Sequence, residues 1–329
     1  MRTRDGGFVV TGTGVSAWVL AADSQGTLLW QYNDPVEDVN DTGSQSVPQS
    51  EFHGAVPLAN GNTLLCGGKF KSGQTDNLLV TLDRDGRPVE RRVEVPNNDP
   101  NLKYSNFYQC FPWRDGIQLV GSANDGKHGY IWLLELDGTG AKRGQALLDN
   151  VTVGADATPG GPSFVFTAWN SPGDFRVIRC NEKGEILAMR IIAGEFIVQL
   201  RPVVETQNTW FVLYRAGKAT LYTLDERLQD VRPSMEIKGH FDPQAGRGYV
   251  RADGSMILFG RSSNAEIALI SKQGKPLAIR EFSPKYPSFS VGDALPVSAD
   301  EFVTVRGSVG QDPKDQGLVM SWVKIKEGK

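Results

Sequence analysis

The chain has 329 residues, of which 40% are hydrophobic and 22% charged, and its formal net charge at pH 7 is −3. This balance allows a large core and argues against a disordered chain. The slight acidity argues against a nucleic-acid-binding surface, which needs a basic excess. No run of about 18 apolar residues occurs, so no segment is expected to span a membrane. The 37 glycines and 18 prolines are spread along the chain, as is typical of many short strands joined by turns.

A four-residue turn ending in glycine recurs from one end of the chain to the other. Asp83–Gly86, for example, follows the apolar run Leu78–Leu82 and precedes a second strand-like run. Glycine supplies the positive φ of a tight turn, and an Asp or Asn at the first position bonds the local backbone. The copies occupy residues 23–26, 83–86, 137–140, 181–184, 225–228, 271–274 and 325–328; the fifth has lost its glycine and the seventh its polar first residue.

A second mark, a proline followed by a polar turn and a β-rich run, falls once in most repeats. Proline lacks the N–H that an interior ladder needs, so it fits the exposed end of a strand. Each repeat is therefore predicted to hold four antiparallel strands, and a spacing of roughly 50 residues points to a β-propeller. The marks lie at Pro57, Pro112, Pro159, Pro202 and Pro296, with Arg251 in the remaining slot.

The prediction is an all-β fold, a seven-bladed β-propeller of four-stranded antiparallel blades in a single domain over residues 1–329. The strands that would close the ring are expected to be missing or incomplete, because the chain starts at the second strand of the first repeat and stops after the third strand of the last. A closed ring would be a monomer. The predicted blades cover approximately residues 1–32, 52–96, 106–150, 151–193, 196–238, 246–284 and 290–329.

The segment GGFVVTGTGVSAWVLAADSQGTLLWQY resembles the repeats of bacterial delta-60-type propellers, in which a DGG-aromatic strand precedes an Asp-x-x-Gly turn and a Leu-Trp strand. The resemblance is close over residues 5–32, fair over 52–140 and faint after 150. It implies the fold and no activity. The tryptophan pattern of quinoprotein dehydrogenase propellers is absent, because Trp30 is the only tryptophan on a fourth strand. No cofactor is therefore expected.

The resemblance favours a bacterial protein of the periplasm or cell surface, but the residues leave the cytoplasm open. Residues 1–10 contain no apolar export signal core. Cys66, Cys110 and Cys180 match no zinc or redox spacing and are expected to be buried free thiols, which suits a reducing compartment.

Aligning the repeats on the proline mark brings polar residues into columns three and four positions before it. Alternation along a strand places each column on one face, so these side chains could converge at the mouth of the central channel. The alternative is that they merely line a water-filled channel. The candidate ligand-binding residues are His53, Tyr108, Gln109, Asp156, Gln199, Arg201, Arg247 and Asp293.

Catalytic signatures are sparse: the chain contains no HExxH, no G-x-S-x-G and no phosphate-binding glycine loop. His53, His128 and His240 could meet on one face and bind a metal, but solvated loop histidines explain them as well, and no metal is predicted. Two long polar loops, 33–51 and 307–317, could carry recognition.

The leading hypothesis is a non-enzymatic binding or scaffolding propeller that engages a protein or polysaccharide ligand through its loop face. One alternative is a hydrolase or lyase acting on a glycan at the channel mouth, which a meeting of His53, Tyr108, Arg247 and a carboxylate of shifted pKa would favour. Another is a toxin-neutralising or assembly partner. The residues leave the question of enzymatic activity open, with the binding role preferred.

Overall fold

The structure is a computed structural model, and it describes most of the chain. The chain divides into two compact units. The first comprises Met1–Pro159 with Ala168–Ser171 and Cys180–Ile186, and the second Gly160–Thr167 with Pro172–Arg179 and Leu187–Lys329. Outside the described residues lie 2, 4, 14–15, 36–49, 72–73, 97–100, 103, 150–155, 161–162, 172–173, 182, 184, 194–195, 203–208, 216–217, 225–227, 229–230, 238–247, 252, 260–265, 274, 282–288, 299–300, 309–316 and 325–329.

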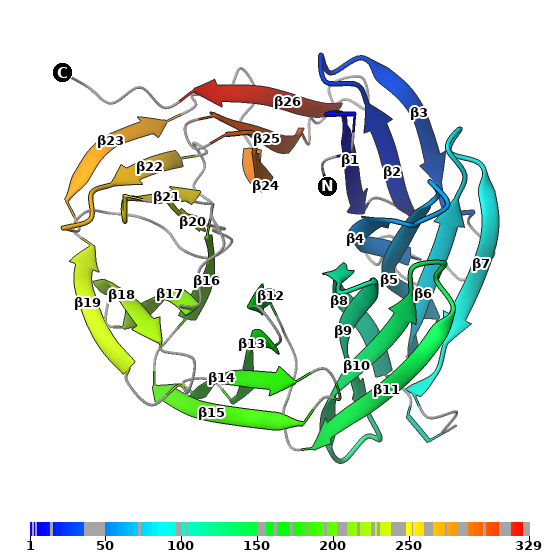
Figure 1. Cartoon of the computed structure of the whole chain (residues 1–329), viewed down its shortest axis with the longest axis horizontal. Helices are drawn as coiled ribbons and strands as arrows, with labels where there is room; N and C mark the ends of the chain where they lie inside the picture. Colours follow the sequence, from blue (N-terminus) through cyan, green and yellow to red (C-terminus); the bar gives the residue numbers. More distant parts are fainter. Residues whose placement is uncertain are drawn as a thin grey trace. The chain divides into compact units, whose positions relative to one another are not determined.

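The first unit consists of antiparallel strand groups that follow the chain order (Figure 1). A three-stranded sheet has the order β1-β2-β3. The next two groups, β4–β7 and β8–β11, are linked into one eight-stranded sheet by a single parallel pair, Thr75 with Tyr104. The strands are β1 (Phe8–Thr13), β2 (Ala17–Ala22), β3 (Leu28–Asn33), β4 (Ser50–Pro57), β5 (Thr63–Lys71), β6 (Gln74–Leu82), β7 (Pro88–Glu94), β8 (Tyr104–Trp113), β9 (Gly116–Asn124), β10 (Gly129–Asp137) and β11 (Lys142–Asp149).

A four-stranded antiparallel sheet of β12 (Asp156–Gly160), β13 (Ser163–Ser171), β14 (Asp174–Asn181) and β15 (Ile186–Ala193) has residues in both units.

The rest of the second unit repeats the same arrangement. Two four-stranded groups, β16–β19 and β20–β23, join through parallel pairing of β16 with β20, and β24-β25-β26 form a three-stranded sheet. No α-helix occurs in the part of the chain that the structure describes. The strands are β16 (Phe196–Pro202), β17 (Thr209–Arg215), β18 (Lys218–Leu224), β19 (Val231–Ile237), β20 (Gly248–Val250), β21 (Met256–Phe259), β22 (Glu266–Ile270), β23 (Pro276–Glu281), β24 (Phe289–Pro296), β25 (Glu301–Ser308) and β26 (Gly317–Lys324).

The predicted turns form as expected where they are described. In the Asp83 turn, Oδ1 of Asp83 accepts hydrogen bonds from the N–H groups of Asp85 and Arg87, at 2.9 and 2.8 Å. Asp23, Asp137 and Asn181 bond the residues two and four positions on in the same way. The fourth-position glycines that the structure describes, Gly26, Gly86 and Gly140, adopt a positive φ, which is +79° at Gly86. The structure therefore confirms the predicted turns at these positions.

The proline marks also lie where expected, at the ends of the first strands of their groups. Pro57, Pro202 and Pro296 are the last residues of β4, β16 and β24. Pro112 and Pro159 each stand one residue before the end of their strands, β8 and β12. At a strand end the missing N–H of proline disturbs the ladder least, which agrees with the sequence prediction.

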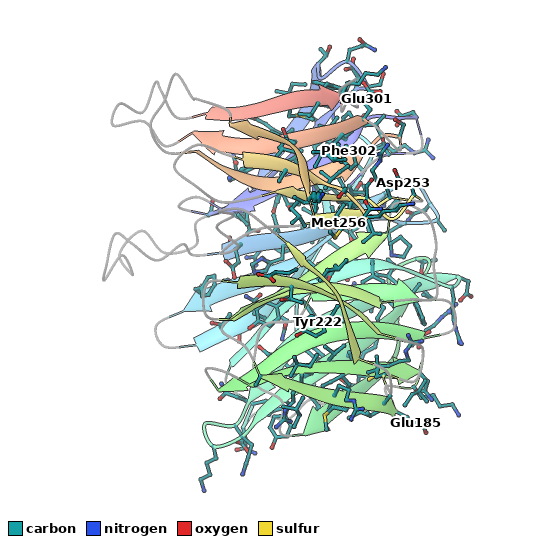
Figure 2. The ribbon with its side chains drawn as sticks, turned by 90° about the vertical axis from the view of Figure 1, so that its left-hand side faces the viewer. Glu185, Tyr222, Asp253, Met256, Glu301 and Phe302 are labelled. Atoms are coloured by element: carbon teal, nitrogen blue, oxygen red, sulfur yellow. A yellow bond between two sulfur atoms is a disulfide. The ribbon has the colours of Figure 1, made fainter. Side chains whose placement is uncertain are left out.

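Each unit has its own buried apolar core. In the first, a cluster including Val56, Leu79, Phe107 and Trp132 packs between β4–β6 and β8–β10, with the Phe107 and Trp132 rings stacked at 4.9 Å. In the second, Figure 2 labels Met256 and Phe302, both fully buried. The ring of Phe302 packs against that of Tyr249 at 5.6 Å.

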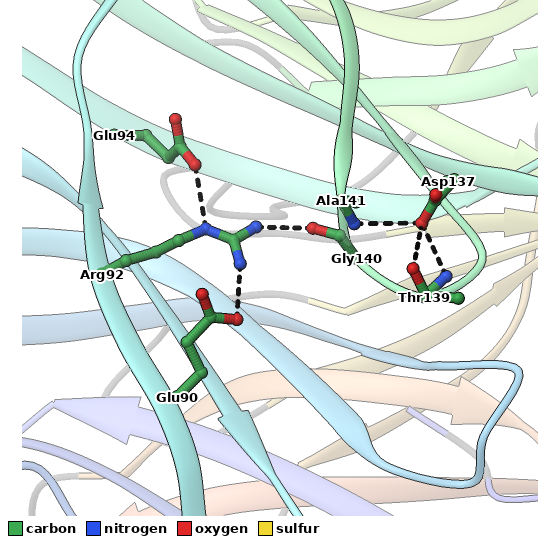
Figure 3. Close-up of polar contacts among 7 residues, drawn as sticks. All are labelled: Glu90, Arg92, Glu94, Asp137, Thr139, Gly140 and Ala141. Atoms are coloured by element: carbon green, nitrogen blue, oxygen red, sulfur yellow. Dashed lines mark hydrogen bonds and ion pairs between the residues drawn. The ribbon is translucent and has the colours of Figure 1, made fainter.

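The fourth (outer) strand of a repeat contacts the turn of the following repeat, and this contact links the two repeats. Arg92 of β7 donates from Nη2 to the carbonyl oxygen of Gly140 at 2.6 Å, while Glu90 and Glu94 hold the rest of its guanidinium (Figure 3). Arg190 of β15 makes the equivalent bond, 3.0 Å long, to the carbonyl oxygen of Leu228. Gly140 is the fourth residue of its turn, and Leu228 stands at the same position of its sequence repeat; both have a positive φ.

Candidate functional site

Two β-bulges on neighbouring first strands define the candidate site. In β4 the pairing with β5 skips a residue between Phe52 and Gly54, which leaves His53 unpaired. In β8 the pairing with β9 skips between Phe107 and Gln109, which leaves Tyr108 unpaired. A bulge turns a side chain away from the regular alternation and is common beside functional sites. His53 and Tyr108 come from equivalent positions of consecutive repeats, and their ring centroids lie 6.1 Å apart.

Glycines opposite β4 and β8, the first (inner) strands of their repeats, make room for these bulges. Gly121 pairs with Phe107, and a Cβ at Gly121 would lie 2.5 Å from the carbonyl oxygen of Asn106. Gly67 pairs with Phe52 in the same relation to the other bulge, and a Cβ there would collide with the carbonyl of Glu51. Any larger residue at either position would push the inner strand away.

A hydrogen-bond network joins the two strands at the bulges. Oε1 of Glu51 lies 2.7 Å from Nε2 of His53 and accepts a hydrogen bond from Nδ2 of Asn106 at 2.6 Å. Because Nε2 of His53 faces a carboxylate, it carries the proton and donates, which leaves the lone pair of a neutral ring on Nδ1. Asn106 belongs to β8, so Glu51 connects the two inner strands.

Tyr108 completes the cluster from the other side. Its hydroxyl oxygen lies 3.0 Å from the hydroxyl oxygen of Ser122 on β9. Burial raises the pKa of Tyr108, the bond to Ser122 opposes the rise, and the charge of Glu51 adds to it. The phenol is therefore protonated at neutral pH and able to donate.

Glu51 is ionised in this setting. Burial alone would raise its pKa, but the hydrogen bond and charge of His53, with the bond from Asn106, outweigh burial and lower it. The side chain of His53 is 30% exposed and that of Glu51 18%. The cluster thus offers a fixed carboxylate, a partly exposed imidazole and a protonated phenol. Such a set can hydrogen-bond a polar ligand or transfer protons at its edge.

The structure brings two of the predicted site residues together and describes a third beside them. Gln109 follows Tyr108 in β8 and pairs with Val120. Asp156, Gln199, Arg201 and Asp293 lie in β12, β16 and β24, but their side chains lie outside the described residues, as does the whole of Arg247.

The structure describes two of the three histidines that could meet to bind a metal, His53 and His128. His128 lies in the β9–β10 loop, where its Nδ1 is 3.3 Å from Oδ2 of Asp125 and its backbone N–H donates to Oδ1 of the same residue. His240 falls outside the described residues, as do most of the loop 33–51 and all of 309–316 in the loop 307–317. In the described part of the chain, no group of three or more His, Cys, Asp or Glu side chains is placed to hold a metal ion.

Sequence reasoning missed Glu51, Asn106 and Ser122. Glu51 and Asn106 stand two residues before His53 and Tyr108, in the matching segments Glu-Phe-His and Asn-Phe-Tyr. That pattern could have drawn attention to them. Ser122 carried no signal of its own, because its role depends on pairing between strands.

The expectation of three free thiols was wrong. Cys66 of β5 and Cys110 of β8 form a disulfide, with their Cα atoms 6.4 Å apart and a sequence separation of 44. The two residues belong to neighbouring repeats, and sequence spacing does not reveal closeness between repeats. Cys180 is free and buried, and burial raises the pKa of its thiol to about 12.

Comparison with known proteins establishes the fold alone. No family model matches the chain, and no curated protein matches it. Similar solved structures include the polysaccharide lyase Uly1 (TM-score 0.59, 8% identity, 99% of this chain and 89% of that one) and Sqt1 of Saccharomyces cerevisiae (0.54, 13%, 99% and 83%). A third is the Dos1 propeller (0.51, 12%, 95% and 76%).

These similarities and the antiparallel four-stranded groups identify the protein as a β-propeller. One of these similar proteins is named as a polysaccharide lyase and another only as a propeller, and at 8–13% identity they show the fold and give no function. No helix in the described part of the chain is long and apolar enough to cross a bilayer.

Proposed function

We propose that this protein is a non-enzymatic binding β-propeller whose ligand is a glycan held at the bulge cluster of Glu51, His53, Asn106 and Tyr108. The observation that carries the proposal is the meeting of an ionised carboxylate, an imidazole and a phenol from two inner strands. Sugars present many hydroxyl groups that both donate and accept, and they pack against aromatic rings. Binding sites commonly combine a few convergent polar groups with such rings.

Isothermal titration with a panel of soluble neutral and acidic polysaccharides tests this proposal. We expect one class to bind, and Tyr108→Phe or His53→Ala to weaken that binding about tenfold, the usual effect of losing one or two ligand hydrogen bonds. His128→Ala is the matched control, because this exposed histidine lies in the β9–β10 loop. Binding to none of the glycans, or equal binding by all variants, would refute the proposal.

A second candidate, a glycan-acting lyase or hydrolase, is favoured by the carboxylate-held His53 beside a protonated Tyr108. Neutral His53 could take a proton through Nδ1 while Tyr108 donates one to a leaving oxygen. Incubation with the same polysaccharides separates the two candidates. An enzyme would produce new reducing ends, with ultraviolet absorbance of a new carbon–carbon double bond if it is a lyase, whereas a binding protein would leave the polymers intact.

The proposal extends to location: the protein works in the periplasm or on the cell surface. The disulfide supports this, because such bonds persist in oxidising compartments, and so does the delta-60-type resemblance. Fractionation of the encoding organism, with the thiols alkylated at lysis, tests the location. A cytosolic protein with three reduced cysteines would contradict it.

A further inference from the structure

The Cys66–Cys110 disulfide lies directly beside the two bulges. Cys66 stands opposite Gly54 in the β4–β5 ladder, and Gly54 is the residue after His53. Cys110 is two residues after Tyr108 in β8. Each cysteine is therefore anchored next to one of the two bulges.

The backbone of Gly54 packs directly on the disulfide. A Cβ at Gly54 would lie 2.8 Å from Sγ of Cys110 and 3.0 Å from Sγ of Cys66, closer than real Cβ contacts come. Both cysteines are buried, with exposed fractions of 0% and 8%. Because the sulfurs fill the space behind this bulge, the position of β4 depends on them.

Other connections between the two strand groups near the site are few. In the described part of the chain, β4–β7 and β8–β11 share one backbone pair, Thr75 with Tyr104. The contacts of Asn106 with Glu51 and His53 and the packing of the apolar cluster also join them at the site, while the bond from Arg92 to Gly140 joins them elsewhere. The disulfide is the covalent link between β5 and β8, and β4 is held to β5 by backbone pairing in which Gly54 lies opposite Cys66.

We propose that the Cys66–Cys110 disulfide is a positioning clasp that holds Glu51 and His53 against Asn106 and Tyr108, and that its reduction by a dithiol releases the site. The inference rests on the proposed function only in taking this cluster as the ligand site. A thiolate of the dithiol attacks one sulfur, which releases the other cysteine as a thiolate and leaves a mixed disulfide. The second thiol of the dithiol then attacks the dithiol's own sulfur in that bond and releases the remaining cysteine. The protein gains two electrons and two protons, and the dithiol becomes a cyclic disulfide.

The test compares the oxidised protein with the double variant Cys66→Ala/Cys110→Ala, using Cys180→Ala as the control for loss of a buried thiol. The readout is coupling across the strands: the coupling energy of a Glu51→Ala/Asn106→Ala double-mutant cycle, measured by urea denaturation at neutral pH. We expect a clear coupling energy in the oxidised protein and in Cys180→Ala, and none in the double variant. Glycan affinity should fall about tenfold in the double variant, as expected when preorganisation is lost.

Equal coupling in the oxidised protein and the double variant, with only the melting temperature lowered, would overturn the proposal and leave a plain structural crosslink. Coupling lost in the double variant while no form binds any glycan would support the clasp and refute the proposed function. If the double variant does not fold, dithiothreitol treatment of the native protein replaces it, with mass spectrometry of alkylated thiols. Reduction only after global unfolding would overturn release of the site by a dithiol.

Discussion

Glu51 connects the two inner strands because its carboxylate bonds both His53 and Asn106. Its pKa is lowered, which means that its folded-state pKa lies below its unfolded value of about 4.3. The stability it contributes is complete above the unfolded pKa and is lost as the pH falls through the folded pKa.

We therefore expect wild-type stability to fall more steeply on acidification below about pH 4.3 than that of Glu51→Gln, which cannot titrate. Urea denaturation at a series of pH values measures this difference. Parallel pH profiles for the two proteins would show that Glu51 is not held by the cluster. Asp85→Asn is a suitable control, because that side chain is exposed and outside the cluster.

Arg114 adopts a left-handed backbone conformation that is unfavourable for most residue types. Its φ is +55° in the turn between β8 and β9, and it is exposed to solvent. Left-handed geometry costs an ordinary L-residue roughly 1 kcal/mol, and Asn or Gly tolerates it better. Arg114→Asn should therefore raise the free energy of unfolding by about 0.5–1 kcal/mol. Chemical denaturation would contradict this if the variant were equal to or less stable than the wild type.

At the scale of elements, the disulfide between β5 and β8 and the free Cys180 predict how many thiols react under each condition. The native protein should show no reactive thiol at neutral pH, because the pKa of buried Cys180 is about 12. Denaturation without reductant should expose one thiol, and denaturation with reductant all three cysteines. Three thiols in the unreduced, denatured protein would show that the β5–β8 crosslink does not form.

The contact of Arg92 with the following turn depends on the shape of its side chain. The guanidinium bonds Glu90, Glu94 and the carbonyl oxygen of Gly140 at once. A lysine ammonium lacks this planar fork, so we expect Arg92→Lys to cost about 0.5–1.5 kcal/mol, nearly as much as Arg92→Ala. Thermal or urea denaturation measures both. Full retention of stability in Arg92→Lys would mean that charge alone makes the contact.

At the scale of the whole molecule, the sequence predicted what local chemistry determines. The Asp83–Gly86 turn and the strand end at Pro57 depend on φ and on a missing N–H, which adjacent residues reveal. The propeller class followed from their repetition, and similar structures confirm it. The seven-blade count and the single domain remain predictions.

The site could be predicted only in part, because it depends on pairing between strands. His53 and Tyr108 were found from their column, but Glu51, Asn106 and the crosslink of Cys66 to Cys110 arise from contacts between residues more than 40 positions apart. A local sequence pattern does not show which residues of two repeats lie in contact. The bulges themselves depend on glycines across the ladder, at 67 and 121.

The bond from Asn106 to Glu51 joins two inner strands in one cluster. A double-mutant cycle with Glu51→Ala and Asn106→Ala, measured by urea denaturation at neutral pH, tests it most directly. We predict a coupling energy of at least about 1 kcal/mol, as expected for a hydrogen bond to a charged, part-buried group. A parallel cycle pairing Glu51→Ala with Arg143→Ala, whose exposed guanidinium bonds Asp115, should be additive. Additivity within about 0.3–0.5 kcal/mol for Glu51 and Asn106 as well would contradict the account.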